Sequence, residues 1–148
     1  MNTDRSLTRI LGIDPGYGRL GIAIIDKNFK EKETVVYSDC FETSKTENIH
    51  NRFLQVGNEI EKIISKFKPD ILAIETLFIT KNQKTAMHVA ESRGIIIYEA
   101  MKHGLEIYEF SPMEIKTSIT GDGSSDKSHI IKMVHLLVEI PKNNARDD

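Results

Sequence analysis

Hydrophobic residues form two kinds of pattern along this chain, short runs and longer segments with a helical period. Three short runs rich in β-forming residues cover residues 9–14, 20–26 and 34–41, and the brief turns between them predict antiparallel hairpins. From Ile49 to Phe67, apolar residues recur instead at steps of three and four, which predicts a helix with one apolar face. The same criteria predict four further elements: a strand over residues 71–74, a helix over 83–103, a strand over 105–110 and a helix over 128–139.

This order of elements predicts an α/β fold, in which helices cover a mixed sheet. The three hairpin-linked strands would pair antiparallel, and the later strands, which alternate with helices, would add to them in parallel. The order is similar to the ribonuclease H-like architecture. Because 148 residues fit one compact domain, we expect residues 1–148 to form a single domain.

The composition constrains the location of the protein more than its function. Cys40 is the single cysteine, which excludes an internal disulfide and a paired-cysteine zinc site. No apolar run approaches the roughly 18 residues needed to cross a bilayer, and the polar start lacks the apolar segment of a secretory signal. We therefore expect a cytoplasmic protein with no membrane partner. The net charge of −2 disfavours non-specific coating of nucleic acid, but it allows a local basic groove.

Four acidic residues lie at strand ends or at the end of the sequence. Asp14 ends the first strand, Glu75 follows the strand over 71–74, and Asp147 and Asp148 close the sequence. An acid at the end of a buried strand needs compensation for its charge, and oxygen ligands suit Mg²⁺ or Mn²⁺ rather than zinc. Two such ions about 4 Å apart can hydrolyse a phosphodiester. The alternative interpretation is that these acids are solvated strand ends or helix caps.

Several motifs occur in the order found in a known nuclease family. They are Ile13-Asp14-Pro15-Gly16 with Gly21, Ile74-Glu75-Thr76-Leu77-Phe78 with Lys81-Asn82, Ala90-Glu91-Ser92-Arg93-Gly94, Lys116, and Gly121-x-Gly123-x-x-x-Lys127. Over about residues 9–148 this series resembles the RuvC family of Holliday-junction resolvases. The resemblance implies a magnesium-dependent endodeoxyribonuclease that resolves four-way DNA junctions by paired symmetric nicks, in homologous recombination and DNA repair.

The resemblance also assigns metal ligands. Asp14 and Glu75 are expected to bind two Mg²⁺ ions, with Mn²⁺ as a substitute. The family's third acid falls on Asp148, or on Asp147 in a gap-free register. Its fourth acid would fall at position 150 or 151, beyond the 148 residues of this sequence. We therefore expect the C-terminal helix of the family to be missing and cleavage to be weakened.

For DNA, the resemblance implies that Phe78 stacks on a base opened at the junction centre. Packing of Phe78 in the core is the alternative. The expected phosphate contacts are made by four basic residues: Lys81, Arg93, Lys116 and Lys127.

The two-fold symmetry of a four-way junction predicts a homodimer with two active sites. The helix over 83–103 offers one face for it, in which small residues allow close approach and larger ones supply apolar area: Ala86, Ala90, Gly94, Ile97 and Met101. The same stripe could instead pack on the sheet. A branch-migration helicase complex is a further partner that the resemblance suggests.

Two other interpretations remain open. The shorter RuvX/YqgF-type relatives, linked to ribosomal RNA processing, share the opening signature, although the later motifs argue against them. A junction-binding module without catalysis is the second, because the fourth acid falls outside the sequence. The histidines are not spaced as a metal site, and we expect them at the surface or partly buried: His88, His103, His129 and His135.

Overall fold

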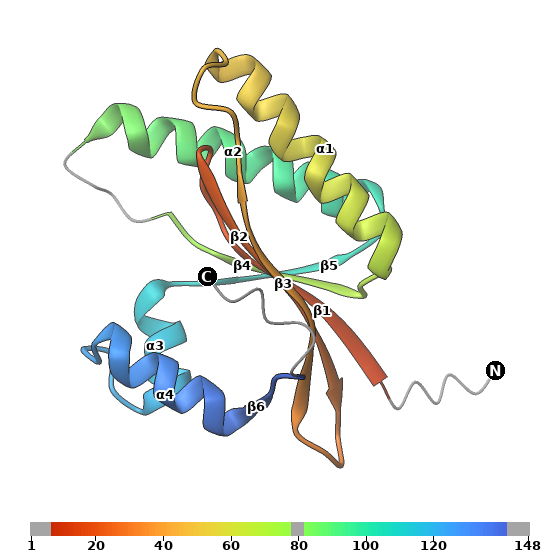
Figure 1. The fold of residues 1–148 in the computed structure, drawn as a ribbon, viewed down its shortest axis with the longest axis vertical. Helices are drawn as coiled ribbons and strands as arrows, with labels where there is room; N and C mark the ends of the chain where they lie inside the picture. Colours follow the sequence, from red (N-terminus) through yellow and green to blue (C-terminus); the bar gives the residue numbers. More distant parts are fainter. Residues whose placement is uncertain (1–6, 78–81, 142–148) are drawn as a thin grey trace.

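The computed structural model describes residues 7–77 and 82–141, and Figure 1 shows how its helices and strands are arranged. In chain order the elements are β1 (Leu7–Asp14), β2 (Arg19–Asn28), β3 (Glu33–Glu42), α1 (Ile49–Phe67), β4 (Ile71–Glu75), α2 (Gln83–Lys102), β5 (Glu106–Phe110), α3 (Pro112–Thr120), α4 (Lys127–Leu137) and β6 (Val138–Glu139). Within these described residues, no helix is long and apolar enough to cross a membrane.

The strands form one six-stranded mixed sheet in the order β5-β4-β1-β2-β3-β6. β1, β2 and β3 pair antiparallel through short turns, whereas β4 adds in parallel to β1 and β5 adds in parallel to β4. The predicted sheet, with three antiparallel strands followed by parallel ones, is therefore confirmed. β1, β4 and β5 all point the same way, so their carboxyl ends share one edge of the sheet.

The core lies between the sheet and one helical layer. In Figure 1, α1 and α2 lie together on one side of the sheet, and α3 and α4 lie on the other. Alternate residues of the central strands point towards α1 and α2, and each fully buried Leu or Ile contributes about 1.5–3 kcal/mol. Most of this core comes from three strands and two helices: Leu11, Ile13, Leu20, Ile22, Ile24, Val56, Ile60, Ile63, Ile64, Leu72, Ile74 and Ile96. By contrast, α3 and α4 contain no buried residue.

Helix α1 begins and ends where local chemistry requires it. The Asn48 side chain accepts a hydrogen bond from the backbone N–H of Asn51, which caps the first turn. At the other end Lys68 adopts left-handed geometry, with φ of 49°. Pro69 disfavours helical geometry in the residue before it, so the helix ends at Phe67, as predicted.

The C-terminal third differs from the prediction in two respects. α3 was not predicted, although Ser111 and Glu114 form a capping box around its first turn and Pro112 occupies its start. The last predicted helix ends at Leu137, because Val138 and Glu139 pair in parallel with Glu33 and Thr34 of β3. This pairing is a tertiary contact, which helical periodicity does not reveal.

Candidate active site

Strand register brings Asp14 and Glu75 together. Ile13 of β1 pairs with Ile74 of β4 in parallel, so the next residue on each strand, Asp14 and Glu75, ends the two neighbouring strands side by side. Because successive side chains point to opposite faces, and Ile13 and Ile74 point into the core, both acids lie on the opposite face. That is the face beside α3 and α4.

The two carboxyl groups interact directly. Burial raises the pKa of Glu75 above its ordinary value of 4.5, and the negative charge of Asp14 and a hydrogen bond between the two side chains raise this pKa further. The positive charge of Lys116 on α3 lowers it in part. Two carboxylates can share a hydrogen bond only when one of them is protonated. A divalent cation held between the two ionised carboxylates would offset their repulsion in place of a proton.

The space beside Asp14 suits a bound ion. Gly21 of β2 pairs with Asp14, and a Cβ at position 21 would lie 3.1 Å from the Asp14 Cβ and 3.9 Å from its Oδ2 atom. Glycine therefore keeps this flank of the Asp14 side chain open. Two carboxylates at neighbouring strand ends form a donor set of the kind that Mg²⁺ and Mn²⁺ prefer.

The turn after Asp14 is held by residues from two helices and a loop. The Ser92 hydroxyl, buried on α2, donates to the Gly16 carbonyl at 2.7 Å. The Thr43 hydroxyl donates to the Tyr17 carbonyl at 2.6 Å and accepts from the Nε atom of Arg52 at 2.9 Å. These bonds fix the path of the chain directly after Asp14.

Arg93 holds the end of β4. Its Nε atom donates to the backbone carbonyl of Glu75 at 2.9 Å, and its Nη2 atom forms an ion pair with Glu109 of β5. The Arg93 side chain is 17% exposed. The guanidinium therefore joins the strand ends of β4 and β5 through one planar group, a geometry that a lysine cannot reproduce.

The other predicted site residues divide into two groups. Lys116 lies half-buried on α3 near Glu75, and Lys127 is exposed in the first turn of α4. The predictions for the remaining residues fall outside the described part of the chain: Phe78, Lys81, Asp147 and Asp148. Sequence reasoning did not find Gly21, Ser92 or Arg93 as supports of the acids, because strand register and the docking of α2 place them there.

We expect Glu75→Gln to change the pH dependence of stability in metal-free protein. Because the pKa of Glu75 is higher in the folded protein than in the unfolded chain, the folded state binds its proton more tightly. The contribution of Glu75 is therefore fully present below pH 4.5 and is lost as pH rises through the folded pKa. Glu75→Gln should therefore make the free energy of unfolding depend less on pH. Urea unfolding in chelator, from about pH 4 to about pH 8, measures it.

Glu42→Gln provides the control for this experiment, because Glu42 is an exposed strand-end acid 59% accessible in its side chain. This variant should leave the change of unfolding free energy with pH close to that of the unmodified protein. A slope that is the same in Glu75→Gln and in the unmodified protein would contradict the raised pKa. Added Mg²⁺ should restore stability at neutral pH in the unmodified protein, because metal binds the ionised carboxylate.

We also expect Arg93→Lys to separate positioning from DNA contact. If Arg93 mainly holds Glu75, junction cleavage should fall about 10- to 100-fold, since partners that orient metal ligands have effects of that size, while junction binding changes little. Lys127→Ala supplies the comparison, since loss of a phosphate contact should weaken binding and reduce its salt slope by about 1. If Arg93→Lys instead binds the junction more weakly but cleaves the bound junction at the normal rate, Arg93 contacts a DNA phosphate and does not position Glu75.

The fold and these acids define a class of protein. A mixed sheet with three antiparallel strands, followed by parallel strands, carries two acids at adjacent strand ends, as in ribonuclease H-like nucleases. The chain belongs to one family within that class: residues 10–148 match the model of the family described as crossover junction endodeoxyribonuclease RuvC.

Similar proteins agree with this assignment. The crossover junction endodeoxyribonuclease RuvC of Caldicellulosiruptor saccharolyticus is 45% identical over 138 residues, which cover 90% of this chain and 82% of that protein. The protein of the same name from Brachyspira hyodysenteriae is 42% identical over 139 residues, covering 93% and 84% of the two chains. The fold matches Thermus thermophilus RuvC solved in complex with a Holliday junction substrate, with a TM-score of 0.84 and 23% identity over 95% of this chain and 85% of that one.

Proposed function

We propose that this protein resolves four-way DNA junctions by paired symmetric nicks, in homologous recombination and DNA repair. Family membership over residues 10–148 supports the reaction class, and the single observation that carries the site is that Asp14 and Glu75 end two paired parallel strands side by side. The match to the RuvC family, together with the later motifs, does not favour a RuvX/YqgF-type function.

Asp14 and Glu75 are the proposed ligands of two Mg²⁺ ions, with Mn²⁺ as a substitute. When bound, such ions lower the pKa of the attacking water and stabilise the departing oxygen. Asp14 and Glu75 hold their carboxylates at rigid strand ends, where small displacements are resisted by the hydrogen bonds of the sheet. Asp148, or Asp147, is the proposed third ligand, on the strength of the family resemblance.

Lys116 is the basic residue that the structure best supports as a DNA contact. Its charge acts on Glu75, so a phosphate held at the acids would also lie within its reach. This positive charge would offset the repulsion between the carboxylates and the DNA backbone. For Lys127, Lys81 and Phe78, the proposed contacts rest on the family resemblance, as does a branch-migration helicase complex as partner.

A homodimer through α2 is the proposed assembly. One face of this helix carries five exposed residues at helical spacing: Met87, Ala90, Gly94, Tyr98 and Met101. A Cβ at Gly94 would meet nothing within 4 Å, so a second helix has room to approach. The stripe is shifted from the predicted one, because Ala86 is half-buried and Ile97 packs against the core.

The dimer predicts a specific effect of Tyr98→Lys. Tyr98 is 65% exposed on the proposed face, and a charge buried at the centre of an interface costs about 2 kcal/mol or more. The variant should dissociate at least about tenfold more readily, as measured by sedimentation. Phe29→Lys is the matched control, since Phe29 is 82% exposed in the turn between β2 and β3. If Tyr98→Lys and Phe29→Lys form dimers equally well, the dimer interface does not include this face of α2.

The proposed function is tested with a labelled synthetic four-way junction and a duplex of the same sequence. In Mg²⁺, the protein should nick two opposite strands of the junction at symmetric positions and leave the duplex intact, and chelation should stop the reaction. Selective binding to the junction without nicks would instead support a non-catalytic junction-binding module. Equal cutting of both DNAs would contradict junction selectivity.

A further inference from the structure

A second cluster of potential metal ligands lies far from Asp14 and Glu75. Glu61 of α1, Glu99 of α2 and His103, the residue that caps the end of α2, each offer one ligand atom, and these three atoms lie within 4.8 Å of one another. Helix α2 starts after the carboxyl end of β4 and ends before the amino end of β5. At 1.5 Å per residue, Glu99 is therefore about 24 Å along the helix from Gln83. The cluster lies at the opposite end of the parallel strands from the active site.

Glu99 supplies the buried part of this cluster. The residue is only 9% exposed, although it is charged. Its Oε1 atom lies 3.8 Å from the ammonium of Lys102. Its Oε2 atom is shielded from solvent and forms no hydrogen bond with any described residue. The Nδ1 atom of His103 lies 3.9 Å from this oxygen, too far for a hydrogen bond. A buried carboxylate oxygen without a partner is costly, so this position calls for a cation.

His103 is already oriented as a metal ligand. Its Nδ1 atom lies 2.9 Å from the backbone carbonyl of Glu99. A carbonyl only accepts hydrogen bonds, so Nδ1 carries the proton and Nε2 keeps a free lone pair. Metal-binding histidines commonly donate their second N–H to such a carbonyl, which fixes the ring and its tautomer.

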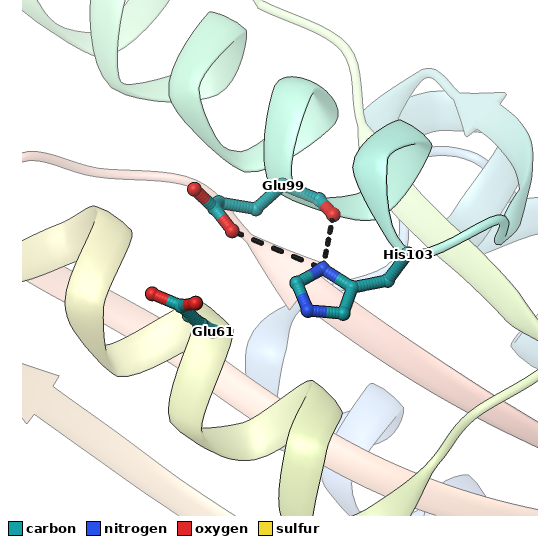
Figure 2. A group of neighbouring side chains, drawn as sticks. All are labelled: Glu61, Glu99 and His103. Carbon is teal, nitrogen blue, oxygen red and sulfur yellow. Dashed lines mark hydrogen bonds and ion pairs between the residues drawn. The ribbon is translucent and has the colours of Figure 1, made fainter.

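The two helices provide the ligands from opposite sides. Figure 2 shows Glu61 on α1 facing Glu99 on α2 and His103 at the C-terminal cap of α2. Glu99 and His103 are four residues apart, so both project from one face of α2. The liganding atoms of a tetrahedral ion, with bonds of about 2.0–2.2 Å, lie about 3.4 Å apart. Glu61 is exposed, so its side chain can close the difference by rotation while the His103 ring keeps its bond to the Glu99 carbonyl.

We propose that Glu61, Glu99 and His103 form a binding site for a divalent transition-metal ion, Zn²⁺ in particular. One imidazole and two carboxylates suit Zn²⁺ and disfavour Mg²⁺, which prefers oxygen ligands in a regular octahedron. Three protein ligands leave a fourth position for water. The ion would link the C-terminal halves of α1 and α2, and so brace the helix that carries Ser92 and Arg93.

The test measures Zn²⁺ binding by the whole chain, with millimolar Mg²⁺ present to saturate the acids of the active site. Calorimetry should show one Zn²⁺ site per chain, and Co²⁺ at the same site should give visible d–d absorption bands. Loss of a hydrogen-bond partner of a metal ligand already weakens affinity about 10- to 100-fold. Loss of a ligand in His103→Gln or Glu61→Gln should therefore weaken Zn²⁺ binding about 100-fold or more. Both variants should also lose the rise in Tm that Zn²⁺ causes.

Two controls make the outcome decisive. His129→Gln removes an exposed histidine of α4 and should leave Zn²⁺ binding unchanged, while Asp14→Asn should retain it because the active site is separate. Circular dichroism establishes that each variant is folded. The proposal is overturned if the unmodified protein binds no Zn²⁺, if His103→Gln binds it as tightly as His129→Gln does, or if Asp14→Asn alone abolishes binding. None of these results depends on junction cleavage, so the proposed function stands or falls separately.

Discussion

Asp14→Asn should reduce junction cleavage by at least about 1,000-fold, an effect comparable to removal of one member of a catalytic group that acts as a unit. The amide keeps the shape of the side chain but removes the negative charge that faces Glu75. Without that charge, divalent ions lose a ligand, and Glu75 loses the neighbour that raises its pKa. Single-turnover cleavage of a labelled four-way junction measures the effect.

Binding of the junction should survive this substitution, because phosphate contacts and not the acids supply the attraction to DNA. Asp126→Asn is the matched control. Asp126 caps α4 by accepting from the backbone N–H of His129, and asparagine caps a helix equally well, so cleavage should stay near normal. Cleavage by Asp14→Asn at the rate of Asp126→Asn would remove Asp14 from the metal site and overturn the proposed mechanism.

Gly16→Ala should lower the free energy of unfolding by about 3 kcal/mol, near the upper end for overpacking of a tight site. A Cβ at position 16 would lie 2.0 Å from the backbone carbonyl oxygen of Arg19, so the turn between β1 and β2 would have to open. This turn follows Asp14 directly, and displacement of a reacting group by 1 Å can cost about 100-fold in rate. We therefore expect cleavage to fall together with stability, as urea unfolding and junction cleavage would show.

Gly12→Ala tests whether the effect belongs to the turn or to any added methyl group in β1. A Cβ at Gly12 would approach only the carbonyl oxygen of Ala23, at an ordinary 3.8 Å. Its effect on unfolding should therefore be small, below about 1 kcal/mol. Equal destabilisation by Gly12→Ala and Gly16→Ala would show that close approach to Arg19 is not the cause.

The periodic part of the fold could be predicted from the sequence, and the part set by tertiary contacts could not. Five strands were predicted from short runs of β-forming residues between turns, and the helices α1, α2 and α4 from apolar residues that recur at steps of three and four. α3 (Pro112–Thr120) has only nine residues, too few turns for a helical period to stand out in the sequence. Its Ser111-Pro112-Met113-Glu114 start does match a capping box and could have indicated it. β6 depends entirely on its pairing with β3.

The candidate site shows the same division. Asp14 and Glu75 were recognisable because a charge at the end of an apolar strand is unusual, and their convergence followed from strands that lie side by side. The role of Arg93 was not recognisable, since its partners belong to residues 75 and 109 and its motif suggested DNA instead. The spacing of the histidines does not indicate the second cluster, because the other two ligands, Glu61 and Glu99, are carboxylates on two helices.

Two consecutive residues of α2 hold two separate strand ends: Ser92 bonds to the turn after β1, and Arg93 bonds to the last residue of β4. This arrangement has a consequence for the order of folding. A chain whose hairpins have formed, but whose α2 has not yet docked, would contain both acids without the contacts that fix them. We therefore expect tight binding of active-site ions to appear late in refolding, after most of the circular dichroism of the sheet has been regained. Nuclease activity would then be confined to chains that have completed their packing, and partly folded chains would leave DNA uncut.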